Sequence, residues 1–88
     1  MTKKSLFQEA RSTSFVINLM PRQELLAHRH PGYDVNLFVF EGDGECTLDG
    51  VRHPLSWRDV IHCEGSQLLS VKNTGRKFMS VYVVLAGK

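Results

Sequence analysis

The stretch His28–Gly50, HRHPGYDVNLFVFEGDGECTLDG, decides the fold. It opens with two histidines that one residue separates, continues as an apolar run from Asp34 to Phe40, and then turns, most clearly at Asp49-Gly50. An Asp-Gly pair between short strand-like runs is a strong hairpin signal. Side chains alternate along an extended chain, so His28 and His30 share one side of it. The stretch therefore predicts paired strands that carry two imidazoles on one side.

The remainder of the chain repeats this pattern of short apolar runs divided by turn residues. Proline, glycine, asparagine and aspartate interrupt the runs at near-regular intervals, and no segment shows the period of an amphipathic helix. Several short strands at regular spacing are typical of an all-β sandwich or barrel. Residues 24–27 lead into the histidine pair, and we expect strands at residues 14–19, 34–40, 45–48, 51–55, 60–63, 67–72 and 78–85.

The length of 88 residues allows one domain, because two domains of half that size could not each bury a core. We expect residues 14–88 to form the β domain, and residues 1–13 to form an N-terminal arm or an added edge strand. A domain this small has a narrow stability margin, which a shared interface would widen. A homodimer is the expected assembly on this ground.

The charge and hydropathy patterns exclude two classes of partner. The net charge of +2 is too small for a nucleic-acid-binding protein, and we expect Lys3 and Lys4 to be ordinary solvated surface. No apolar run reaches the roughly 18 residues of a membrane-spanning helix, and residues 1–20 lack the apolar core of a signal peptide. A cytoplasmic location is therefore expected, where Cys46 and Cys63 would be free, buried thiols.

The chain resembles the cupins, a family of small β-barrels of the jelly-roll type. Their first motif reads glycine, five residues, H-x-H, three or four residues, glutamate, six residues, glycine. The resemblance extends from about Ser14 to Leu85 and is carried by the segments LMPRQELLAHRHP, FVFEGDGECTLDG and DVIHCEGS. His28 and His30 match the histidine pair, and Gly42 matches the closing glycine. The resemblance implies a single-domain, all-β jelly-roll barrel whose metal site includes both histidines.

Other positions of the two motifs depart from the family pattern. Arg22 takes the place of the opening glycine, and Val35 takes the place of the metal-binding glutamate. The second motif reads glycine, five residues, P-x-G, two residues, histidine, three residues, asparagine. Its histidine position falls on Leu69. Arg58, Glu64 and Ser66 take the places of its first glycine, its proline and its second glycine. Only Asn73 matches the motif, at the asparagine position.

These departures leave an incomplete set of metal ligands. The resemblance implies three histidines and a glutamate around a divalent ion, whereas this chain supplies His28 and His30 beside Val35 and Leu69. Stable sites for zinc, nickel, iron or manganese use more protein ligands than two. Loss of the carboxylate also removes negative charge that would offset the charge of the ion. A cavity floor of valine and leucine suits an apolar ligand or a filled core.

Three further residues could complete a metal site. His62 and Cys63 are consecutive on a strand, so alternation turns one of them toward the cavity, and imidazole and thiolate both suit zinc-like ions. The other interpretation is a surface histidine beside a core cysteine. Asp34 precedes the glutamate position by one residue, which is a change of face. It could bind a metal only if the loop after Pro31 shifts the register, and otherwise it caps the turn there.

Three functions stay open on the sequence. The first is a cupin-like barrel that binds a metal ion or a small molecule with weak or no catalysis, which the histidine pair beside two apolar positions favours. The second is a metal-dependent enzyme, an oxygenase, isomerase or lyase acting on a small organic acid, which needs a third ligand. The third is an accessory or sensor module that binds a partner protein. No catalytic residue is assigned, and we favour the first hypothesis.

Overall fold

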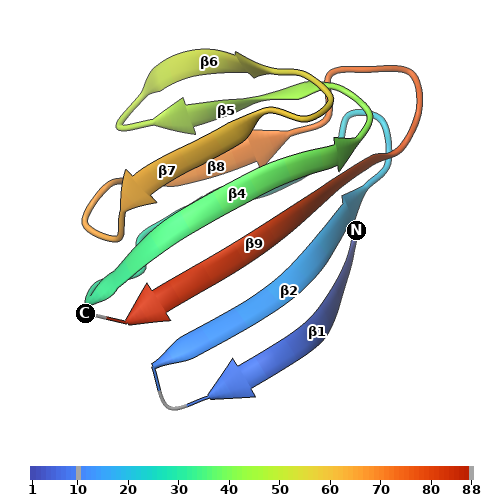
Figure 1. Cartoon of the computed structure of the whole chain (residues 1–88). Coiled ribbons are helices and arrows are strands. Elements are labelled where there is room, and N and C mark those ends of the chain that lie inside the picture. Colours follow the sequence, from blue (N-terminus) through green and yellow to red (C-terminus); the bar gives the residue numbers. More distant parts are fainter. Residues whose placement is uncertain (10, 88) are drawn as a thin grey trace.

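The computed structural model describes residues 1–9 and 11–87 of the chain. Within these residues the protein forms nine β-strands and no helix (Figure 1), so no helix there is long and apolar enough to cross a membrane. The prediction of an all-β fold is confirmed. The strands are β1 (Thr2–Glu9), β2 (Ser12–Leu19), β3 (Glu24–His28), β4 (Tyr33–Glu41), β5 (Gly44–Leu48), β6 (Val51–Leu55), β7 (Val60–Glu64), β8 (Leu69–Lys72) and β9 (Met79–Gly87).

The strands form two antiparallel sheets. The larger sheet has the order β1-β2-β9-β4-β7, and the smaller sheet has the order β3-β8-β5-β6. From β2 onward the chain crosses repeatedly from one sheet to the other, so that strands far apart in sequence become neighbours, as β2, β9 and β4 do in Figure 1. Most predicted strands recur with ends shifted by one or two residues, as where β2 begins at Ser12 and β8 at Leu69.

The core lies between the two sheets and follows the alternation of each strand. In β4, Val35, Leu37 and Val39 are buried, whereas Asn36 and Phe38 between them are half-buried on the outer face. Alternation of this kind is expected where one face of a sheet covers a core and the other faces solvent. The buried apolar side chains from both sheets form one continuous cluster.

The N-terminal strand β1 occupies an edge of the larger sheet, where it pairs with β2. In this register Lys3 lies opposite Ile17, and Lys4 lies opposite Val16. Paired residues share a face of the sheet, and Ile17 belongs to the core. The register therefore turns Lys3 toward the inner face and Lys4 toward the outer face.

A buried asparagine ties two loops together at one end of the barrel. The Asn73 side chain donates from Nδ2 to the carbonyl oxygens of Leu19 and Lys77, at 2.8 Å each, and its Oδ1 accepts from the Gly75 N–H at 2.9 Å. The Asn73 carbonyl oxygen accepts from the Arg22 N–H at 2.9 Å. The side chain thus satisfies backbone groups at the end of β2 and in the β8–β9 connection, and the backbone of Asn73 binds the β2–β3 connection.

We expect Asn73→Ala to lower the free energy of unfolding by about 2–4 kcal/mol, because it leaves buried carbonyl and amide groups unpaired. Urea denaturation of the two proteins measures the difference. Asn36→Ala, on the outer face of β4, serves as the control and should cost under about 1 kcal/mol. Equal losses in both variants would contradict a special role for Asn73.

Candidate functional site

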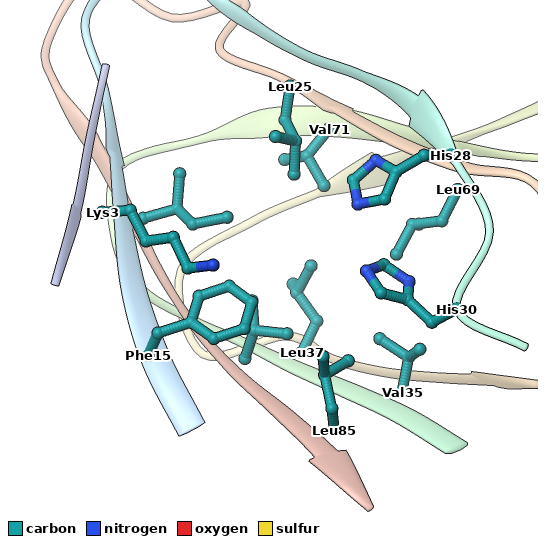
Figure 2. Close-up of a pocket in the computed structure, with 12 residues that line it drawn as sticks. Lys3, Phe15, Leu25, His28, His30, Val35, Leu37, Leu69, Val71 and Leu85 are labelled. Atoms are coloured by element: carbon teal, nitrogen blue, oxygen red, sulfur yellow. The ribbon is translucent and has the colours of Figure 1, made fainter. Parts of the chain in front are cut away.

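A cavity of about 200 Å³ lies between the sheets and takes its walls from β1, β2, β3, β4, β8 and β9, together with His30. Most of its lining is aliphatic, and Phe15 contributes an aromatic ring. Polar side chains enter it at two places, which Figure 2 shows on opposite sides: Lys3 on one side, and His28 and His30 on the other. The cavity lining is therefore mostly apolar and includes three nitrogen-bearing side chains among the described residues.

A bulge in β3 turns His28 into the cavity. Leu25 pairs with Val71, and His28 pairs with Leu69, so β3 advances three residues while β8 advances two. In a regular strand, positions three apart face opposite sides, but one extra residue restores the face. As a result both Leu25 and His28 line the cavity.

A close backbone contact holds His30, which follows the end of β3. The His30 N–H donates to the Gly65 carbonyl oxygen at 2.9 Å, and the Gly65 N–H donates to the carbonyl oxygen of Tyr33 at 2.8 Å. A Cβ at position 65 would overlap the carbonyl oxygen of His30. Glycine at this position lets the β7–β8 turn approach the histidine loop closely enough for both hydrogen bonds.

The two imidazoles lie against each other in an edge arrangement, with ring centroids 4.4 Å apart and planes at 62°. Nδ1–H of His28 donates to the carbonyl oxygen of Leu26 at 2.8 Å, which leaves the lone pair of neutral His28 on Nε2. Burial lowers the pKa of His30 below its ordinary value, and the positive charges of His28 and Lys3 lower it further. The predicted proximity of His28 and His30 is confirmed. The role of these two histidines as metal ligands stays a prediction.

Two of the four positions that carry metal ligands in the family motifs are apolar in this chain, and they face the same cavity as the two histidines. Val35 and Leu69 both line it beside the two histidines. Among the described residues, no group of three or more His, Cys, Asp or Glu side chains could hold a metal ion together. The cavity therefore keeps the expected positions but has aliphatic side chains at two of them.

The structure does not bring His62, Cys63 or Asp34 to the cavity. His62 is exposed and donates from Nδ1 to Oδ1 of Asn36 at 2.8 Å. Cys63 is buried in the core, so the interpretation of a surface histidine beside a core cysteine is confirmed. Asp34 lies within β4 beside the inward-facing Val35, so it is a strand residue and not the loop residue that we expected. The loop after Pro31 therefore does not shift the register.

Both cysteines are free and buried, as predicted. Burial raises the pKa of the Cys63 thiol, with a smaller contribution from Asp49, and burial also raises the pKa of the Cys46 thiol. Thiolate is the form that binds metals and attacks electrophiles. Neither cysteine therefore has the lowered thiol pKa that is typical of a nucleophilic cysteine.

Lys3 is solvent-exposed, as the sequence indicated, and its side chain also lines the cavity. Its ammonium nitrogen lies 4.2 Å from the centroid of the Phe15 ring, within the range of a cation–π interaction. Alternation along residues 1–13 could have placed Lys3 and Lys4 on opposite faces. Only the pairing of β1 with β2 decides which of the two faces inward.

A sequence profile described as Cupin domain matches residues 15–85 of the chain. The protein belongs to the cupin family. A comparison with curated protein sequences found no match. At the four positions that carry metal ligands in the family motifs, this cupin has histidines at 28 and 30 and aliphatic residues at 35 and 69.

Solved structures confirm the jelly-roll fold. An RmlC-like cupin protein from Desulfovibrio desulfuricans is 24% identical, has a TM-score of 0.88, and aligns over 97% of this chain and 80% of its own. A protein with a double-stranded β-helix domain from Klebsiella pneumoniae is 22% identical (TM-score 0.92; 98% and 76%). A predicted oxalate decarboxylase from Thermotoga maritima is 19% identical (TM-score 0.93; 98% and 79%). At these identities the similarity shows the fold alone.

We expect Gly65→Ala to displace the histidine loop and lower the free energy of unfolding by about 1–3 kcal/mol, because its methyl group overlaps the His30 carbonyl oxygen. Urea denaturation measures the loss, and the amide chemical shifts of residues 28–33 report the displacement. Gly75→Ala is the matched control, since a Cβ there meets nothing closer than 3.4 Å. If Gly65→Ala and Gly75→Ala lower the free energy of unfolding equally, the close contact between Gly65 and His30 is contradicted.

Stability should fall when the protein is acidified through the titration of His30. The folded state holds the pKa of His30 below 6.5, its ordinary value, so the unfolded state binds the proton first. The free energy of unfolding then decreases as the pH falls below about 6.5 and levels off below the folded-state pKa. Denaturation between about pH 7.5 and pH 5 should show a smaller loss for His30→Gln than for the parent protein.

The control for this pH dependence is His53→Gln, which changes an exposed histidine of β6. It should keep the pH profile of the parent protein. If His30→Gln also keeps that profile, burial does not disfavour the charged form of His30 and the interpretation is wrong.

Proposed function

We propose that this cupin binds a small, largely apolar organic molecule in its barrel and performs weak or no catalysis. The observation that carries the proposal is that Val35 and Leu69 line the same cavity as His28 and His30. The positions that would complete a metal site instead offer aliphatic surface to a ligand. The proposal therefore favours the small-molecule form of the first hypothesis drawn from the sequence.

The cavity has the character of a ligand pocket. Such pockets combine a mostly apolar lining with a small number of placed polar groups. Drug-sized ligands occupy about 300–1,000 Å³, so the volume of about 200 Å³ here suits a smaller molecule. The two imidazoles supply hydrogen-bonding groups at one side of the cavity, which would orient a polar group of the ligand.

The residues present do not fit a tightly held divalent ion. Two imidazoles line the cavity, and none of the described residues that line it is acidic. The Lys3 ammonium lines the same space and would repel a cation. A metal-dependent oxygenase, isomerase or lyase would need a third protein ligand, and His62, Cys63 and Asp34 do not line the cavity.

The homodimer, the cytoplasmic location and the partner-binding hypothesis remain predictions.

The test combines elemental analysis of purified, untagged protein with a titration of hexan-1-ol followed by amide chemical shifts. We expect much less than one zinc, nickel, iron or manganese ion per chain, before and after incubation with each metal. We expect hexan-1-ol to shift amide signals of cavity-lining residues such as Leu37, Val71 and Val83, because the alkyl chain enters the apolar cavity. Residues of β6, which does not line the cavity, should not respond.

Val35→Glu combined with Leu69→His provides the positive control for the metal assay. This double variant restores the glutamate and third histidine that the family resemblance implies, and it should gain metal binding that the parent protein lacks. About one ion per chain in the parent protein, lost in His30→Ala, would overturn the proposal in favour of a metal site. Absence of any shift with hexan-1-ol would also count against it.

A further inference from the structure

We propose that Lys3 sets the charge preference of the cavity, so that its ligand is a small organic carboxylate with a short apolar body. This inference rests on the proposed function and names its ligand class. It uses a residue of β1, the edge strand, which lies outside the region matched by the family profile.

The charges around the cavity favour an anion. Three of the described residues that line the cavity are basic, Lys3, His28 and His30, and none of the described lining residues is acidic. Lysine carries a full positive charge at neutral pH and offers three N–H donors. Lys3 is exposed in the structure, and a ligand that fills the apolar cavity beside it would exclude part of the water around its ammonium, which strengthens the attraction for an opposite charge.

The strand pairing and an aromatic ring position this ammonium. Lys3 pairs with the core residue Ile17, which directs its side chain inward, whereas the neighbouring Lys4 belongs to the opposite face. The ammonium nitrogen lies 4.2 Å from the centroid of the Phe15 ring. Figure 2 shows the side chain reaching over this ring into the pocket. The cation–π contact limits the freedom of a long side chain, so less entropy is lost when an anion binds.

The arrangement of the polar groups defines the shape of the ligand. Lys3 and the two imidazoles lie on opposite sides of the cavity, with aliphatic side chains such as Leu37 and Val71 between them (Figure 2). A carboxylate at Lys3 would leave its hydrocarbon body against these side chains. The far end of the same molecule would face the imidazoles, which can hydrogen-bond a hydroxyl or carbonyl group.

Three probes with the same six-carbon chain test the charge preference: hexanoate, hexan-1-ol and hexylammonium. Their dissociation constants are measured by chemical-shift titration at low ionic strength. For the parent protein we expect hexanoate to bind about three- to fivefold more tightly than hexan-1-ol, as for an ion pair with an exposed ammonium, and hexylammonium to bind most weakly. The preference for hexanoate should decrease as salt is added.

Lys3→Met keeps the length and apolar stem of the side chain and removes its charge. In this variant hexanoate should lose its advantage, while the affinity for hexan-1-ol should stay within about twofold, because the apolar cavity remains. Lys4→Met removes the same charge from the outer face of the same strand and should keep the hexanoate preference of the parent protein. Lys3→Gln is a second neutral variant in case Lys3→Met does not fold.

The outcomes separate the two proposals. Hexan-1-ol binding in the cavity without a preference for hexanoate would overturn the role of Lys3 and leave the proposed function standing. A hexanoate preference that survives in the Lys3 variants, or that falls equally in Lys4→Met, would also overturn that role, because the preference would then come from elsewhere or from net charge alone. Failure of both hexanoate and hexan-1-ol to bind would overturn the proposed function itself.

Discussion

The pairing of β4 with β9 on one side and β7 on the other fixes which side chains enter the barrel. In this register Val35, Leu37 and Val39 have exposed fractions of 1%, 2% and 0%. A slip by one residue would place Asn36 and Phe38 in the core and these three in solvent, so the burial of apolar area enforces the register. This register also decides where each potential third metal ligand lies. Val35 lines the cavity, its neighbour Asp34 lies on the other face, and Cys63, opposite Val35, is in the core while His62 is outside.

The polar side of the cavity depends on departures from this regularity. Strict alternation from Leu25 would turn His28 away from the cavity, and the bulge in β3 reverses that. His30 then lies beyond the strand, where its N–H donates to the close carbonyl oxygen of Gly65. Regular strands therefore provide the apolar walls, while a bulge and a glycine contact bring the two imidazoles together.

The backbone of the family is retained at positions where its side chains have changed. Arg22 and Arg58 occupy the glycine positions of the two motifs and still have positive φ angles of 72° and 75°, although a left-handed conformation costs a non-glycine residue about 1–2 kcal/mol. Asn73 occupies the asparagine position of the second motif, and its side chain links the end of β2 to the β8–β9 connection. Hydrogen bonds of the surrounding backbone hold these turns in place, so the barrel forms with Val35 and Leu69 at two positions that carry metal ligands in the family motifs.

The sequence by itself determined the all-β class, the approximate strands, the proximity of His28 and His30, and the apolar character of positions 35 and 69. These features depend on local alternation, turn residues and motif spacing, which act over a small number of neighbouring residues. Only the tertiary structure decided which of His62 and Cys63 faces inward, how β3 returns His28 to the cavity, and that Lys3 lines it. Each of these depends on the register between strands distant in the chain. Register is fixed by the burial of whole sheet faces and not by any local signal.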